Sequence, residues 1–115
     1  MPDGSTKPVA MPVSLVGWRA MRKGALLGFA SVRIGKALTI NDVPVLSSSG
    51  RVWASLPGKP VLDAEGRQKR DDRGKPVYVP MAAWADRETA NRFSDAVVGV
   101  LEREHPADLQ PEQQP

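Results

Sequence analysis

The stretch ALLGFASVRIGKALTINDVPVL, residues 25–46, carries the clearest signal of the fold, because it has one apolar segment on each side of a tight turn. Side chains at alternate positions of residues 25–34 fall on opposite faces, as they do in a β-strand. Gly35-Lys36 has the two-residue length that hairpin turns favour. In residues 37–46, Pro44 lacks an N–H, so it should face solvent or a bulge. The pattern predicts an antiparallel hairpin.

Further strands extend this hairpin in both directions along the chain. Residues 9–21 are rich in Val, Leu and Trp, and Pro12 argues for a strand that starts just after it. Residues 51–56 follow a turn at 47–50, and residues 77–81 predict a short fifth strand. The sequence therefore predicts a small antiparallel sheet of four to five strands with short connections.

The C-terminal element is predicted to be a helix that begins after Asp86. Asp86 is suited to an N-cap, and Glu88 puts a negative charge in the first turn, which the helix dipole favours. Pro106 ends the helix. Small residues at Gly28 and Ala30 suggest that something large, such as this helix, packs closely on their strand. An apolar stripe follows helical spacing and should lie on the sheet: Ala90, Phe93, Val97, Val100 and Leu101. The predicted fold class is α+β.

The 115-residue chain is long enough for one domain, which we place at residues 9–105. Residues 1–8 and 106–115 lack apolar periodicity and are predicted to be disordered ends. Within the domain, residues 57–76 are predicted to form an extended basic arm, since the segment is polar in its middle and is bounded by two copies of GKPV.

Several classes of protein are excluded. No apolar run is long enough to span a membrane, and the first residues lack the basic-then-apolar pattern of a secretory signal. The chain has no cysteine, which excludes disulfides and thiolate metal sites. We therefore expect a cytoplasmic protein without a membrane partner.

Little in the sequence points to catalysis, and no enzyme activity, cofactor or metal site is predicted. The single histidine, His105, lies at the helix end, where His commonly serves the exposed carbonyl groups. Asp71 and Asp72 alternate with basic residues, which favours neutralised pairs in solvent over a cation site. Residues 66–75, GRQKRDDRGK, do not have the spacing of a phosphate-binding loop.

Positive charge is unevenly placed, although the net charge is only +3. Between Arg19 and Lys36 there are five basic residues and no acidic one. A sheet face that carries such a segment attracts polyanions whatever their sequence. The candidate nucleic-acid contacts in this segment are Arg19, Arg22, Lys23, Arg33 and Lys36, and those in the arm are Lys59, Arg67, Lys69, Arg70, Arg73 and Lys75.

Single-strand binding also needs rings on which bases can stack. The aromatic residues available are Trp18, Phe29, Trp53, Tyr78 and Trp84. Packing in the core or in a dimer is the favoured interpretation of Phe29 and Trp53. Trp84 precedes the helix cap and is expected to staple onto the helix.

The run LTINDVPVLSSSGRVWASLPGKP, residues 38–60, resembles the core of the SpoVG-like family (stage V sporulation protein G, or septation protein G). An Ile-x-Asp-Ile/Val-x-Val pattern matches residues 40–45. The strand end Met-Pro-Ser-Lys matches Leu-Pro-Gly-Lys at residues 56–59. Residues 25–40 resemble the second strand of the family, and AVVGVLERE at 96–104 resembles its closing helix.

The resemblance implies a small α+β fold that assembles as a homodimer, and a bacterial regulator that binds DNA and in some cases RNA. It places DNA contact just after the Met-Pro-Ser-Lys strand end, which maps onto Lys59. The next position is usually basic in the family but is Pro60 here, and the insertion at 61–75 is longer than in the family. These departures suggest that the basic residues of the arm took over the contact.

Three interpretations stay open. One is a homodimeric SpoVG-like regulator that binds DNA or RNA. The second is a single-stranded DNA-binding protein similar to the transcriptional coactivator p15, another dimer of sheet and helix. The third is a protein-interaction module in which the arm and the Pro/Gln-rich tail engage a partner. Val-rich edge strands often pair with a second copy, so self-association is expected as well.

Overall fold

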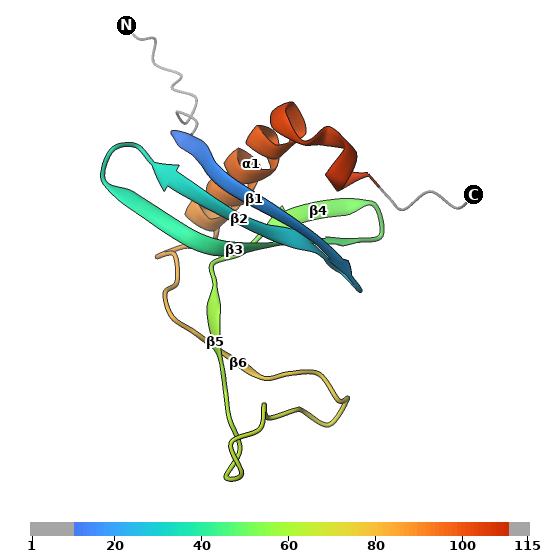
Figure 1. The fold of residues 1–115 in the computed structure, drawn as a ribbon. Helices are drawn as coiled ribbons and strands as arrows, with labels where there is room; N and C mark the ends of the chain where they lie inside the picture. The colour runs from blue at the N-terminus through green and yellow to red at the C-terminus, as the bar shows by residue number, and fades with distance from the viewer. Residues whose placement is uncertain (1–10, 111–115) are drawn as a thin grey trace, which may run out of the picture.

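In the computed structural model, which describes residues 11–110, an antiparallel sheet packs against one long helix (Figure 1). The sheet has four strands in the order β1-β2-β3-β4. Their bounds are β1 Val13–Lys23, β2 Leu26–Ile34, β3 Leu38–Ser48 and β4 Arg51–Ala54. The remaining elements are β5 Gly58–Pro60, β6 Tyr78–Pro80, the helix α1 Arg87–Glu104 and the 3-10 helix η1 Pro106–Leu109. The predicted α+β class is confirmed.

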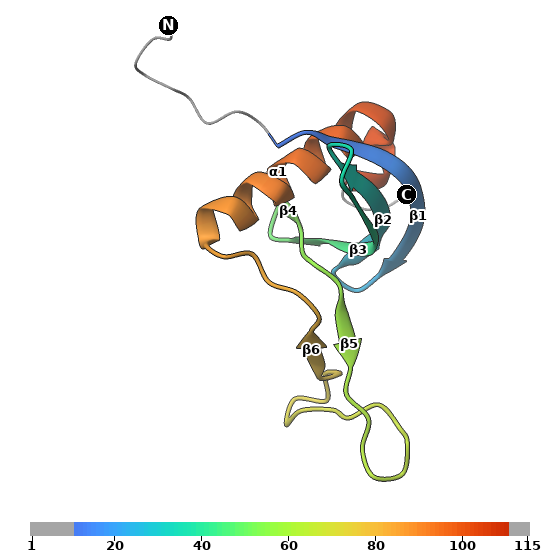
Figure 2. The same ribbon diagram turned by 90° about the vertical axis from the view of Figure 1, so that its left-hand side faces the viewer.

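The fifth strand differs from the sequence prediction. We expected residues 77–81 to extend the sheet, but β6 pairs with β5 in a separate two-stranded ladder, with Lys59 opposite Val79. Pro57 and Pro60 follow β4 closely and lack the N–H that a longer ladder with β3 would need. The chain therefore leaves the sheet after β4, and the ladder projects away from the sheet and helix (Figures 1 and 2).

The helix begins and ends as the sequence predicts. The carboxylate of Asp86 accepts a 2.7 Å hydrogen bond from the Thr89 N–H, and the same bond lowers the pKa of Asp86. The Trp84 ring lies 5.1 Å from the Phe93 ring, as expected of a staple. The last turn closes with the His105 N–H donating to the Leu101 carbonyl. Among residues 11–110, no helix is long and apolar enough to cross a membrane.

The sheet curves around α1, and the core fills the space between them (Figure 2). α1 comes closest to the two edge strands, β1 and β4. Breaks in register bend the strands. One lies where Ala30 pairs with Val43 but Val32 pairs with Ile40, and there the opposite strand has a positive φ of 58° at Asp42. The fully buried side chains of the core come from β2, β3 and α1: Ala30, Val32, Val43, Val45, Phe93, Val97 and Leu101.

The close packing predicted at Gly28 is made by a side chain of the sheet, while Ala30 on the same face belongs to the core shared with the helix. A Cβ on Gly28 would lie 2.8 Å from Cη2 of Trp18 and would also meet the Arg19 carbonyl oxygen. Trp18 reaches across from β1 and packs on the core. The absence of a side chain at Gly28 therefore leaves space for the Trp18 indole on the concave side of the sheet.

The chain after α1 packs against the sheet, where the sequence suggested a disordered tail from residue 106. Within the described part of that tail, η1 brings Leu109 onto the core. The Trp18 indole N–H donates a 2.8 Å hydrogen bond to Asp108. Residues distant in sequence supply these contacts, which composition alone does not reveal. The predicted disordered segment at residues 1–8, like residues 111–115, lies outside the described residues.

Candidate nucleic-acid interface

The arm, defined here as residues 58–80, is a stem that carries two loops (Figure 2). The stem is the β5–β6 ladder. Beyond it, three backbone hydrogen bonds form a closed ring: the Val61 N–H donates to Val77, Val77 donates to Lys69, and Lys69 donates to Val61, at 2.7–2.9 Å. One loop leaves the ring between Val61 and Lys69, and the other between Lys69 and Val77. The two GKPV repeats each deliver their valine to this junction.

Both loops use the same turn, Asp-x-x-Gly followed by a basic residue, at 63–67 and 71–75. In each, the Asp carboxylate accepts from the backbone N–H groups two and four residues later, at 2.9–3.0 Å. The glycines have φ values of 83° at Gly66 and 80° at Gly74, where a side chain would be strained. The loops are thus shaped by their own local sequence.

In the second loop, these hydrogen bonds also lower the pKa of Asp71. The backbone N–H groups of Lys75 and Arg73 donate to the carboxylate and lower the pKa of Asp71 below its ordinary value. Arg70 donates a 2.8 Å hydrogen bond to the Gly74 carbonyl and braces the base of the loop. The turn is therefore held by a charged carboxylate at neutral pH.

The six predicted contacts of the arm share exposure to solvent: Lys59, Arg67, Lys69, Arg70, Arg73 and Lys75. Within residues 11–110, none of them forms an ion pair with a carboxylate. Two of the four carboxylates of the arm, Asp63 and Asp71, bind backbone N–H groups instead. The arm therefore presents exposed cations that outnumber its carboxylates by six to four and form no ion pair with them.

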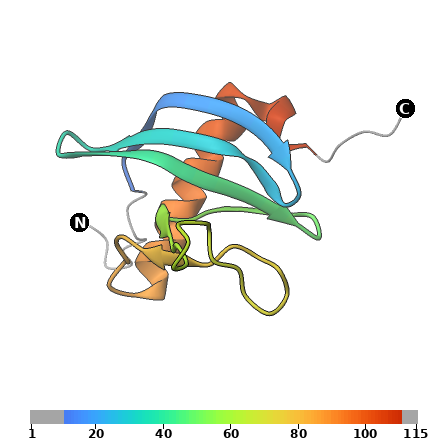
Figure 3. The same ribbon diagram turned by 60° about the horizontal axis from the view of Figure 1, so that its bottom comes forward.

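A second cationic surface lies on the outer face, which we define as the side of the four-stranded sheet turned away from α1 (Figure 3). Cross-strand register identifies its residues, because directly paired positions share a face. Arg19 pairs with Phe29, and Phe29 pairs with Pro44. In the next row, Leu46 pairs with Trp53. None of these five side chains belongs to the core between sheet and helix.

The cations of the outer face come from three strands. The guanidinium carbon of Arg19 lies 5.2 Å from the centre of the Phe29 ring. The same guanidinium is 3.9 Å from the Asp42 carboxylate, with both side chains about two-thirds exposed. Strand alternation and register place three more exposed cations on this face: Lys23, Arg33 and Arg51.

Two predicted contacts are separated from this face. Lys36 lies in the turn between β2 and β3, at the end of the sheet. Arg22 points to the other side, where its guanidinium donates to carbonyl oxygens at the C-terminal end, at 3.3, 3.0 and 2.8 Å, in Ala107, Asp108 and Gln110. Arg22 therefore helps to hold η1 and, although exposed, lies on the side of the sheet opposite the outer face.

Arg51 is a residue that the sequence prediction missed. It precedes Trp53 by two positions in β4, so the two side chains share a face. The same alternation could have identified it from sequence, because residues 51–56 were already predicted to be a strand.

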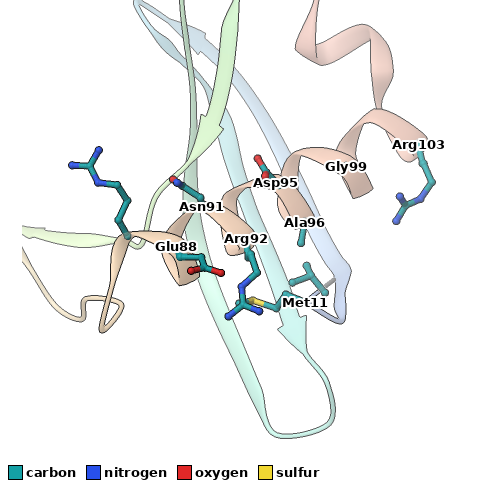
Figure 4. Close-up of a pocket in the computed structure, with 10 residues that line it drawn as sticks. Met11, Glu88, Asn91, Arg92, Asp95, Ala96, Gly99 and Arg103 are labelled. Carbon is teal, nitrogen blue, oxygen red and sulfur yellow. The ribbon is translucent and has the colours of Figure 1, made fainter. Parts of the chain in front are cut away.

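An open groove runs along the side of α1, next to the start of β1 (Figure 4). Its volume is about 770 Å³, and Met11 and Val13 form its apolar wall. The charged side chains that line it are of both signs: Arg87, Glu88, Arg92, Asp95 and Arg103. Such a mixed lining does not favour a polyanion, so the groove is not part of the candidate interface.

Comparison of the chain with protein-family models and with curated proteins finds no match. The candidate interface, which consists of the arm and the outer face, is therefore argued from the geometry of this chain alone.

Proposed function

We propose that the protein binds nucleic acid through the cations of the arm and of the outer face. The observation that carries the proposal is the position of the acid-free basic segment. Its residues Arg19, Lys23 and Arg33 share one open sheet face with Arg51. Cations on one face can contact successive phosphates, and release of condensed counterions then drives binding without base readout.

The SpoVG-like resemblance supports the same proposal and extends it. A sheet with one C-terminal helix is the architecture that the resemblance implies, and Lys59 stands exposed in β5, at the root of the arm. We include in the proposal the homodimer and the regulatory role that the resemblance implies, and the cytoplasmic location expected from the sequence. Two copies would carry two arms, and bivalency would raise the apparent affinity.

The test compares two double variants that each remove two exposed cations. R67A/R73A acts on the arm, where only the backbone N–H groups of these residues make the turn bonds. R87A/R103A acts on the groove beside α1. With labelled DNA at several salt concentrations, we expect the arm variant to bind more weakly. Its slope of log affinity against log salt should be shallower by up to about 2. The groove variant should match the wild type.

Removal of four arm cations, in R67A/K69A/R70A/R73A, should weaken binding further. Unchanged affinity of this variant for every DNA and RNA probe would show that the arm does not bind nucleic acid. Wild-type protein that shows no salt-sensitive binding to any probe would overturn the proposed function as a whole.

A second candidate function has one observation in its favour. Four apolar side chains of the arm and the segment after it are more than half exposed: Leu62, Tyr78, Val79 and Met81. Exposed apolar side chains along one projection are available for contact with another protein. This alternative predicts that Y78A/M81A abolishes partner binding while the arm cations can be removed without effect.

A further inference from the structure

We propose that the outer face is a single-strand binding surface, on which unpaired bases stack against Phe29 and Trp53. This inference rests on the proposed function and specifies the form of nucleic acid that the sheet takes. Figure 3 shows the face open, with α1 on the opposite side of the strands.

The two rings are supported by the sheet and yet lie outside its core. Both are half-buried, and neither is among the side chains packed between sheet and helix. Phe29 lies opposite Pro44, and Trp53 lies opposite Leu46. Apolar neighbours of this kind fix a ring in place, so that little conformational freedom remains to be lost when a base stacks on it.

The spacing of the rings suits a strand that crosses the sheet. Phe29 is on β2 and Trp53 is on β4, and β3 lies between them. Their partners on β3, Pro44 and Leu46, are two residues apart along that strand. Ideal sheet dimensions place the Cα atoms of Phe29 and Trp53 roughly 12 Å apart. Four-stranded sheets in other nucleic-acid-binding proteins stack two or three bases on aromatic side chains in this manner.

Cations flank both rings. Arg19 is paired with Phe29, and Arg51 lies two residues from Trp53 on β4. Lys23 and Arg33 lie farther along the same face. Cations that follow the backbone, together with rings that take the bases, are the combination that single-strand binding needs. A duplex keeps its bases stacked inside, so it can use the cations but not the rings.

The Arg19 guanidinium lies over the Phe29 ring, and its ion pair with Asp42 is weak. The ion pair with Asp42 spans 3.9 Å between two side chains that are 64% and 66% exposed. Such a pair contributes little to stability, so a phosphate can replace Asp42 as the partner of the guanidinium. Movement of Arg19 toward a phosphate would open the Phe29 ring to a base at the same time.

A second copy of the chain is the competing occupant of this face. A symmetric contact would bring the same patch of both copies together. The cationic patch of Arg19, Lys23, Arg33 and Arg51 would then face the same patch of the second copy, with Asp42 as the neighbouring carboxylate. Like charges facing one another disfavour association. Charge complementarity therefore favours a polyanion on the outer face.

The test uses the leucine variants F29L, W53L and F29L/W53L, which keep apolar bulk and all charges but remove the stacking surfaces. The probes are a labelled single-stranded oligothymidine and a duplex of the same length. Each lost ring should weaken single-strand binding by about 5- to 100-fold, while duplex affinity and the salt slope stay at the wild-type values. W53F keeps an aromatic ring, so it should recover much of the single-strand affinity that W53L loses.

Tryptophan fluorescence provides a direct readout of stacking. The oligothymidine should quench the wild-type emission, and W53F should lose most of that quenching, since Trp18 and Trp84 pack toward the core. Single-strand affinity of F29L/W53L equal to wild type would overturn the inference and leave the proposed function intact. A wild-type dimer that becomes monomeric in F29L/W53L would also overturn it, because the face would then be a subunit contact. Wild-type protein that binds neither of these probes nor an RNA oligonucleotide would overturn the proposed function itself.

Discussion

The indole nitrogen of Trp18 donates a 2.8 Å hydrogen bond to the carboxylate of Asp108, 90 residues later in the chain. Trp18 also fills the space over Gly28 on the concave side of the sheet. One side chain therefore joins the first strand to the segment that follows the helix. The chain after α1 is in this way part of the domain.

Loss of the Asp108 carboxylate should weaken the attachment of that segment to the sheet. D108A removes the acceptor of the Trp18 N–H and should lower the free energy of unfolding by about 1 kcal/mol. D108N keeps a carbonyl oxygen that can accept the bond, so it should retain most of the stability. Chemical denaturation measures both, and equal stability of D108A and wild type would contradict the role of this bond.

Gly28 and Gly99 should respond to alanine with opposite signs. At Gly28 the new methyl group would meet the Trp18 ring and the backbone of β1, so G28A should destabilise by about 1–3 kcal/mol. At Gly99, inside α1, the nearest atom is a terminal nitrogen of Arg103 at 3.8 Å. G99A should therefore stabilise by about 0.5–1 kcal/mol through helix propensity. Thermal unfolding of the two variants gives the comparison, and a stable G28A would mean that the indole does not sit where it is described.

Acid should loosen the second loop of the arm. The pKa of the Asp71 carboxyl in the folded chain is lowered below 3.8 by the N–H groups of Lys75 and Arg73. The carboxylate therefore stabilises the turn at pH values above 3.8, and this contribution is lost as the pH falls through the lower, folded pKa. The amide proton shifts of Arg73 and Lys75 should follow one titration with its midpoint below 3.8.

D71N is the matched control for that titration, because its amide oxygen accepts the same hydrogen bonds but does not ionise in this range. Its two amide shifts should stay constant through acidification. A midpoint at or above 3.8 in the wild type would show that the N–H groups do not hold the carboxylate.

Asp42 should weaken nucleic-acid binding at the outer face, since its carboxylate competes with phosphate for Arg19. D42N removes the charge at a position with a φ of 58°, which asparagine tolerates well. We expect affinity for single-stranded DNA to rise about two- to five-fold. D42A distinguishes the effect of the charge from that of the backbone conformation. It should give the same gain in affinity but a lower melting temperature, because alanine tolerates the positive φ less well. No gain in either variant would mean that Arg19 does not contact the ligand.

Local signals in the sequence were sufficient for most of the fold. The N-cap at Asp86, the helix stop before Pro106 and the tight turn after Ile34 each depend on residues that are neighbours in the chain, although the turn has three residues (35–37) and not the predicted two. Four strands and one helix could therefore be predicted with bounds close to those observed. The packing of η1 could not, because it depends on Trp18 and Arg22 from the opposite end of the chain.

The candidate interface was predictable only in part, for a related reason. The small residues Gly28 and Ala30 indicated which face of β2 the helix covers, and Ala30 does lie in the core that includes α1. Packing in the core or in a dimer was the favoured interpretation of Phe29 and Trp53, whereas strand register leaves both outside the core, on the outer face. Similarly, the two GKPV repeats are visible in sequence, whereas their meeting at Lys69 is a property of the folded arm.

The ring of hydrogen bonds among Val61, Lys69 and Val77 has a consequence for how this protein can diverge. Each loop of the arm starts and ends at the ring, so a change of length in one loop disturbs neither the other loop nor the register of the stem. Either loop could therefore be replaced by one of another length or sequence, which would alter what the arm presents to solvent while the sheet and helix stayed constant.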